Sequence, residues 1–309
     1  MSELTRIPVV LPQELVYKIL VHGAEDSTSF SLTLCRTSKF HYQEFFSHLY
    51  NTVVIKNLDG SRKLVKTLRA LEYEYSFGTY QPGLAIENLW LESISNYAVE
   101  IYRFCTKISR FAAPMDNLYW LIHASTSKSL THGEWTTLDP INVANRPSLE
   151  VLILGGGNFR AQFSGLVSNN RSLMSPFWDN ITKLWLTECD DDFREQGIIF
   201  DSFPNLTHFA VPITPAVSPL QPNDILAPFE SLVQHPSLTH LVLVIYPDRL
   251  VPQERTDIIA ALRKALRNEP KLLAVEFNYS DLQLVWDKRY GEKSIWEMAE
   301  AYTNRVKEI

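Results

Sequence analysis

The chain has few cysteines and no pattern among them. Its 309 residues include only three, Cys35, Cys105 and Cys189, which lie far apart and form no CxxC pair. An odd number of widely spaced cysteines favours neither a disulfide framework nor a structural zinc site. We therefore expect a protein of a reducing compartment, either the cytoplasm or the nucleus or both.

Long apolar runs and an excess of basic residues are also missing. No stretch approaches the roughly 18 uninterrupted apolar residues that cross a bilayer. Segment 1–10, with an early acid and Pro8, is not a secretory signal. The 29 Lys and Arg residues against 35 Asp and Glu give a formal net charge of −6, whereas a chain that grips nucleic acid or anionic lipid through charge has a basic excess. We therefore expect neither nucleic acid nor a membrane as a partner.

Recognised catalytic motifs are absent as well. No GxSxG elbow, HExxH helix or kinase signature occurs in the sequence. The run Gly155-Gly156-Gly157 lacks the spacing of a phosphate-binding loop and is typical of a turn after a strand. The acidic run 188–192 is better explained as a solvated loop than as a cation site. We expect no catalytic residue, no metal and no cofactor, and a hydrolase or transferase on a nonrepetitive α/β sheet stays an alternative.

The sequence does contain enough apolar material for a large folded core. Hydrophobic residues make up 45% of the chain and aromatic residues 12%, and seven residues are Trp, which argues against disorder. A six-residue frame recurs with apolar residues at its first, fourth and sixth positions, although Gly133 stands at the fourth position of the third frame. The frames cover residues 86–91, 108–113, 130–135, 149–154, 181–186, 206–211, 238–243 and 272–277, after a weaker one at 50–55.

The spacing of these frames is that of a repeat protein. The eight starts from 86 to 272 are on average about 27 residues apart, inside the ~20–29-residue range of leucine-rich repeats. Stretches with helical periodicity separate some of them, as expected when each parallel strand returns by a crossover. The sequence predicts an α/β fold, a leucine-rich-repeat-like solenoid with a parallel sheet, and an ordinary open α/β sheet is the alternative. The predicted helices cover 61–75, 116–127, 224–233 and 254–268, and a closing helix at 294–306 covers the edge of the last strand.

A different unit precedes the frames. Segment 11–20, Leu-Pro-Gln-Glu-Leu-Val-Tyr-Lys-Ile-Leu, suits a helix with proline in its first turn, and an apolar segment at 30–40 ends in Cys-Arg-Thr-Ser-Lys-Phe. This unit resembles an F-box, whose pattern begins Leu-Pro-x-Glu-Leu, continues to Ile-Leu, and later has an apolar helix followed by Ser-Lys or Ser-Arg and an aromatic residue. The matching residues are Leu11, Pro12, Glu14, Leu15, Ile19, Leu20, Leu32, Leu34, Cys35, Arg36, Ser38, Lys39 and Phe40. With the frames that follow, the chain resembles the divergent F-box and leucine-rich-repeat-like proteins common in fungi.

The resemblance implies two units, a small helical F-box-like unit at 1–50 and an irregular leucine-rich-repeat-like domain with a C-terminal capping helix at 51–309. It implies a substrate-recognition subunit of an SCF-type ubiquitin ligase, not itself an enzyme, whose partners are a Skp-type adaptor, the cullin ligase and an unknown target protein. The adaptor-binding residues that it implies are Leu11, Pro12, Leu15, Ile19, Leu20, Leu34 and Cys35. Two alternatives stay open: an amino-terminal cap that only seals the solenoid, and an interaction scaffold independent of any ligase.

The frames also predict which side chains leave the core. If the first, fourth and sixth residues point inward, the third and fifth lie on the outer face of the sheet. An exposed aromatic and apolar stripe there is a candidate target-binding surface, and the alternative is that a loop or the amino-terminal unit covers it. His208 and His240 share the third position on successive strands, so we expect them about 5 Å apart. The predicted target-binding residues are Trp90, Ile153, Trp185, His208, His240 and Val242.

Overall fold

The computed structural model describes most of the chain, with gaps. The described residues are 11–74, 82–125, 141–143, 145–155, 175–189, 203–213, 233–287 and 293–308. Within them, no helix is both long enough and apolar enough to span a membrane.

Three helices open the described chain: α1 (Gln13–Asp26), α2 (Thr28–Thr37) and α3 (Lys39–Tyr50). Two serines set their boundaries, because Ser27 Oγ accepts a hydrogen bond from the backbone N–H of Phe30 and Ser38 Oγ accepts one from that of His41. The helices enclose a small core of their own. Its buried members are Ala24, Leu34 and Phe45.

The rest of the fold is built on one parallel sheet of eight strands. Every strand pairs with the next one in the sequence, so the order across the sheet is β1 to β8 without a crossover past a neighbour. The strands are β1 (Thr52–Ile55), β2 (Asn88–Leu91), β3 (Arg110–Pro114), β4 (Leu149–Leu154), β5 (Ile181–Leu186), β6 (His208–Pro212), β7 (His240–Ile245) and β8 (Leu272–Glu276).

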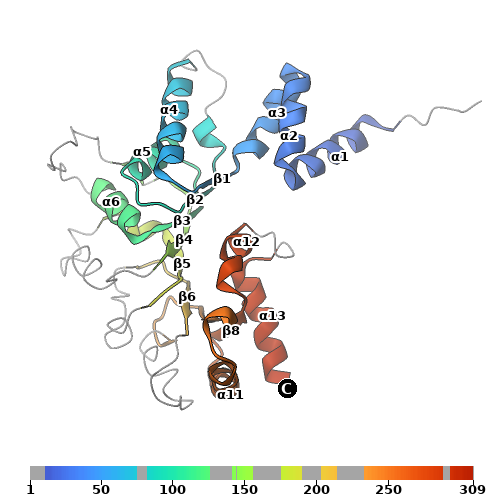
Figure 1. Ribbon diagram of the computed structural model, residues 1–309. Helices are drawn as coiled ribbons and strands as arrows, with labels where there is room; N and C mark the ends of the chain where they lie inside the picture. Colours follow the sequence, from blue (N-terminus) through green and yellow to red (C-terminus); the bar gives the residue numbers. More distant parts are fainter. Residues whose placement is uncertain are drawn as a thin grey trace, which may run out of the picture.

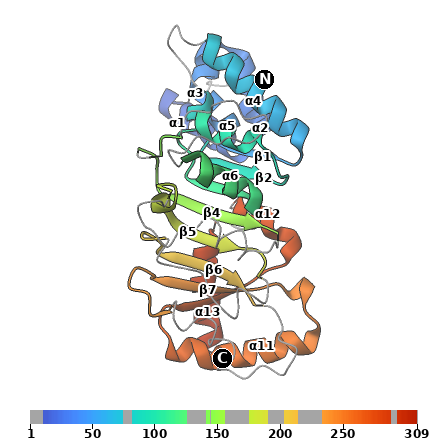
Figure 2. The same ribbon diagram turned by 90° about the vertical axis from the view of Figure 1, so that its left-hand side faces the viewer.

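Helices cover both faces of this sheet, and α1–α3 project from its β1 end (Figure 1). The helices on one face are α4 (Leu58–Glu74), α5 (Tyr97–Phe104), α6 (Met115–Ser125) and α11 (Pro252–Asn268). The helices on the opposite face are α12 (Leu282–Trp286) and α13 (Ile295–Glu308). Figure 2 shows β4 to β7 in sequence order between α6 and α11, with α13 behind them.

Alternate side chains along each strand point into two separate cores, one on each face of the sheet. Leu241 and Leu243 of β7 pack into the large core under α4, α5, α6 and α11. Val242 and Val244, the residues between them, pack into a second core under α12 and α13. A strand buried on both faces needs apolar residues at nearly every position, which is why the frames read as continuous apolar runs.

The predicted α/β class with a single parallel sheet is confirmed. Seven of the eight main frames contain a strand, and the weaker frame at 50–55 contains β1. The frame at 130–135 lies outside the described residues, and β3 pairs directly with β4. The helices predicted at 61–75, 116–127 and 254–268 correspond to α4, α6 and α11, whereas the helix predicted at 224–233 lies almost entirely outside the described residues.

The predicted closing helix is present as α13, and it does cover the edge of the last strand. The hydroxyl of Thr303 accepts a hydrogen bond of 2.8 Å from the N–H of Ala274 in β8. The helix also lies across one face of the sheet, where Ile295, Trp296 and Ala299 are buried in the second core. The prediction that this helix covers the edge of β8 is therefore confirmed, but it missed that the helix also covers part of one face of the sheet.

Candidate protein-interaction surfaces

The first candidate surface consists of exposed apolar side chains on α1–α3. Among the described residues, eight large hydrophobic side chains between positions 11 and 40 are exposed by 36–59%, against five in all the rest. Single exposed apolar residues are common, but a short segment that exposes so many large apolar side chains is a candidate interaction site. We call this set the amino-terminal apolar surface: Leu11, Leu15, Val16, Tyr17, Ile19, Phe30, Leu32 and Phe40.

The structure divides the predicted adaptor-binding residues into two groups. Leu11, Pro12, Leu15 and Ile19 are exposed. Leu20 and Cys35 are only partly buried, and they pack against the small core of the three helices. Leu34 is a member of that core and is 7% exposed. The prediction that Leu34 offers a contact surface is therefore wrong, because its helical face points toward Ala24 and Phe45.

Sequence reasoning left five exposed residues of α1 and its neighbours out of the predicted site. The amino-terminal apolar surface extends beyond the predicted set to Val16, Tyr17, Phe30, Leu32 and Phe40. Leu32 and Phe40 carry a signal in the sequence, since both belong to the residues that match the F-box pattern. Tyr17 is held in place by its hydroxyl, which donates a hydrogen bond of 2.9 Å to Glu44 on α3. That carboxylate raises the pKa of the Tyr17 hydroxyl.

The outer face of the sheet is covered, which overturns the predicted exposure of three residues. Trp90, Trp185 and Val242 do lie on the face opposite α4–α6, as the frames predict, but each is at most 4% exposed. The indole of Trp90 contacts that of Trp286 in α12, with ring centroids 6.0 Å apart. The alternative was right that these side chains are covered, but the cover is the carboxy-terminal pair α12 and α13 and not a loop or the amino-terminal unit.

Ile153 was assigned to the wrong face. It is buried in the large core beneath the helices rather than in the second core. The pairing of β4 with β5 shifts by one residue between Leu149 and Glu150, and Phe111 of β3 pairs with Val151 instead of Leu152. A shift of one residue exchanges the two faces of a strand, so the frame that begins at 149 is out of phase with its neighbours.

A row of polar side chains crosses the sheet on the face that α12 and α13 cover. Each member pairs in register with the next, from β1 to β7. We call this row the polar ladder: Thr52, Asn88, Arg110, Glu150, Lys183, His208 and His240. The sequence carried a signal for it, because Asn88, Arg110, Lys183, His208 and His240 all stand at the third position of their frames.

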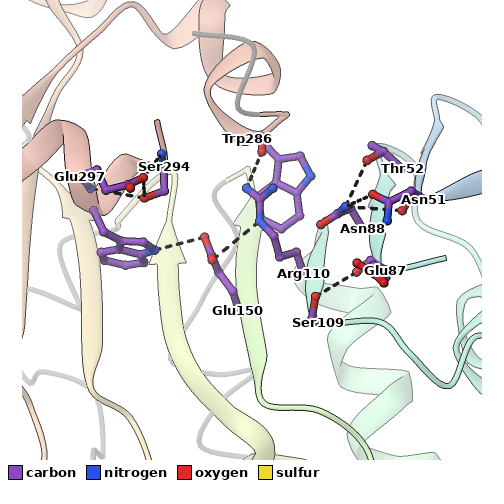
Figure 3. A network of polar contacts seen from close by, with 11 residues as sticks. Asn51, Thr52, Glu87, Asn88, Ser109, Arg110, Glu150, Trp286, Ser294 and Glu297 are labelled. Atoms are coloured by element: carbon purple, nitrogen blue, oxygen red, sulfur yellow. Dashed lines mark hydrogen bonds and ion pairs between the residues drawn. The ribbon is translucent and has the colours of Figure 1, made fainter. Parts of the chain in front are cut away.

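The centre of the polar ladder fastens the carboxy-terminal helices to the sheet (Figure 3). The Arg110 guanidinium stacks on the Trp286 ring at 4.2 Å from its centroid and donates a hydrogen bond to the Trp286 carbonyl. Its Nε lies 3.7 Å from a carboxylate oxygen of Glu150. The other oxygen of Glu150 accepts a hydrogen bond of 3.3 Å from the indole of Trp296. Burial lowers the pKa of Arg110, and Glu150 opposes that effect.

The two histidines meet as predicted. His208 and His240 are paired in register, and their rings stack with centroids 4.4 Å apart and planes inclined by 16°. Neither is fully buried. Among the described residues, no group of three or more His, Cys, Asp or Glu side chains is placed to hold a metal ion.

Comparison with known proteins identifies no relative: no family model, no curated protein and no solved structure matches the chain.

Proposed function

We propose that the protein is a substrate-recognition subunit of an SCF-type ubiquitin ligase, which binds a Skp-type adaptor through α1–α3 and a target protein through the domain that follows. The single observation that carries the proposal is the amino-terminal apolar surface, which stands on the segment that resembles an F-box. Such a subunit would hold a target near the ubiquitin-charged enzyme, so it would contribute proximity and no bond chemistry.

The position of this surface supports docking over a purely structural cap. Residues that only seal the end of the sheet would be buried against it, yet Leu15 and Ile19 are about half exposed. The small core formed by Ala24, Leu34 and Phe45 already holds the three helices together. The exposed residues are therefore not needed to complete that core, and a partner that buried them would gain the transfer free energy of their apolar area.

A leucine-rich-repeat-like solenoid is part of the proposal. The strands follow one another in sequence order, and equivalent threonines link successive turns of chain. The hydroxyl of Thr207 donates a hydrogen bond to the carbonyl of Thr182, and that of Thr239 donates one to the carbonyl of Thr207. A recurring bond between neighbouring units is the kind of nearest-neighbour contact that stabilises solenoids.

The target would bind a surface other than the apolar stripe expected from the frames. Trp90, Trp185 and Val242 are covered by α12 and α13, and Ile153 lies in the large core. Of the predicted target-binding residues, only His208 and His240 keep part of their surface exposed. We therefore place no target contact on the buried stripe.

The test is co-purification of the full chain with a Skp-type adaptor. We expect the native protein to capture the adaptor, and Leu15→Arg and Ile19→Arg to weaken capture at least about tenfold, because a buried guanidinium without a partner is costly. Ile94→Arg is the matched control, since Ile94 and Ile19 are both 59% exposed and Ile94 lies outside α1–α3. Absence of capture by the native protein would remove the ligase proposal. Binding of a partner that survives both substitutions would instead support a ligase-independent scaffold.

A further inference from the structure

Each of the two stacked histidines lies beside the hydroxyl of the threonine that precedes it in the sequence. The hydroxyl of Thr207 lies 3.0 Å from the carbonyl oxygen of Thr182, and that of Thr239 lies 2.9 Å from the carbonyl oxygen of Thr207. Each hydroxyl oxygen also lies 2.8 or 2.9 Å from Nδ1 of the histidine that follows it in sequence. These contacts hold each imidazole beside its own strand with Nδ1 against the threonine hydroxyl.

The charges around His208 disfavour a second proton on it. On the sheet, Lys183 precedes it in the polar ladder and His240 stacks on its other side. On α13, the nearest aromatic group is the ring of Trp296, which meets the His208 ring edge to face at 5.1 Å. Lys183 also lies over Trp296, with Nζ 5.6 Å from the ring centroid. A proton on His208 would thus place a positive charge between Lys183 and His240.

The carboxylates of this region are engaged elsewhere. Glu300 of α13 lies 3.7 Å from Nε2 of His240, so it would pair with a charge on His240. Glu150 accepts the hydrogen bond from the Trp296 indole, and Glu297 of α13 accepts from Ser294 at the start of its own helix. Burial, Lys183 and His240 together lower the pKa of His208 to about 4, with burial the largest cause.

We propose that the His208–His240 stack is an acid-sensitive contact, which holds the first turns of α13 on the sheet while His208 is neutral and loosens them when it is protonated. The sign follows from linkage. A histidine whose pKa is lowered by folding stabilises the fold fully above the unfolded pKa of about 6.5 and loses that contribution as the pH falls toward the folded value. The loosening would be local, because the Thr303 contact with β8 holds the later part of α13 without any titrating group.

The test compares two measurements on the full chain. In the first, the ring signals of selectively labelled histidines are followed by NMR through a pH titration. We expect His208 to titrate at least one pH unit below the ordinary histidine value of about 6.5. In the second, amide hydrogen exchange of α13 is measured at pH 7 and pH 5.5 and corrected for the intrinsic pH dependence of exchange. We expect protection of α13 to fall about tenfold more than that of α11.

The variant His208→Phe separates the imidazole from every other titrating group. Phenylalanine keeps a flat ring against His240 and Trp296 but cannot take up a proton, while all carboxylates stay in place. We expect the extra loss of α13 protection at pH 5.5 to disappear in this variant, and to persist in His22→Gln. The proposal is overturned if His208 titrates at the ordinary histidine value of about 6.5, or if α13 loses as much protection at pH 5.5 in His208→Phe as in the native chain.

Discussion

Arg110 shows how one residue of the polar ladder connects the sheet to its cover. Its guanidinium touches the ring and the carbonyl of Trp286 and faces the carboxylate of Glu150. Both charged side chains are nearly buried, at 14% and 12% exposed. If one partner of such a pair is removed, the other charge stays buried without a counter-charge. The resulting loss of stability is larger than the net stabilisation that the pair provides.

We therefore predict that Arg110→Ala lowers the free energy of unfolding by about 3 kcal/mol, measured by urea denaturation. A double-mutant cycle with Glu150→Ala should give a coupling of about 1–2 kcal/mol. The matched control is Arg69→Ala. Arg69 lies only 2.6 Å from Glu100, but its side chain is 60% exposed, so its loss should cost under about 1 kcal/mol. Equal costs for the two arginines would contradict the assignment of Arg110 as an anchor of α12.

The residues that sequence reasoning placed wrongly were misplaced for two physical reasons. Alternation identified the correct face for Trp90 and Trp185, but an apolar residue looks the same in sequence whether solvent or another helix covers it. Only a polar interruption can distinguish the two faces of a strand that is buried on both. The third positions of the frames supplied that interruption, and they predicted the His208–His240 contact correctly. Ile153 was placed on the wrong face because the pairing of β4 with β5 shifts by one residue, and the amino-acid composition of a strand does not reveal such a shift.

Among the elements, α13 is the one that ends the sheet. The outer edge of β8 would otherwise expose unpaired backbone groups, a common route to aggregation. Thr303 is 1% exposed. Its hydroxyl oxygen lies 2.8 Å from the backbone nitrogen of Ala274 and 3.4 Å from the carbonyl oxygen of the same residue. One side chain thus takes the place of a ninth strand at this position.

We predict that Thr303→Val lowers the free energy of unfolding by about 1–3 kcal/mol, because valine has the same shape but leaves the N–H of Ala274 buried without its acceptor. Thermal or urea unfolding would measure the loss. Thr256→Val is the control, since Thr256 is an exposed threonine of α11 whose hydroxyl donates only to a carbonyl of its own helix. A cost for Thr303→Val no larger than that of the control would show that α13 does not stabilise the edge of β8.

The elements themselves were largely accessible from sequence. A parallel strand buried on both faces consists of apolar residues over four to six positions; the main frames found β2 to β8, and the weaker frame at 50–55 found β1. The boundaries of α2 and α3 follow from Ser27 and Ser38, which are ordinary helix-capping residues. The role of α12 was not predicted, because a five-residue helix such as Leu282–Trp286 is too short to show periodicity.

At the scale of the whole molecule, the order of the strands creates a gradient of burial. β6 and β7 have neighbours on both sides, and the residues of these strands beyond His208 and His240 are buried. β1 has one neighbour, β2, and Thr52 is exposed while Val53 and Val54 are only half-buried. A sheet built by sequential addition of strands has no contact that links β1 directly to its centre, so local opening should be easiest at this end.

We predict that native-state hydrogen exchange follows this gradient. The slowest amide of β1 should exchange through an opening that requires at least about 1–2 kcal/mol less free energy than the slowest amide of β6, because β1 loses fewer buried contacts when it detaches. The comparison is made within one sample of the full chain, with β7 as the internal reference, since its burial equals that of β6. Equal exchange in β1 and β6 would show that the sheet opens only as one cooperative unit. In that case α1–α3, which adjoin β1, would be a fixed end of the sheet rather than a separable docking unit.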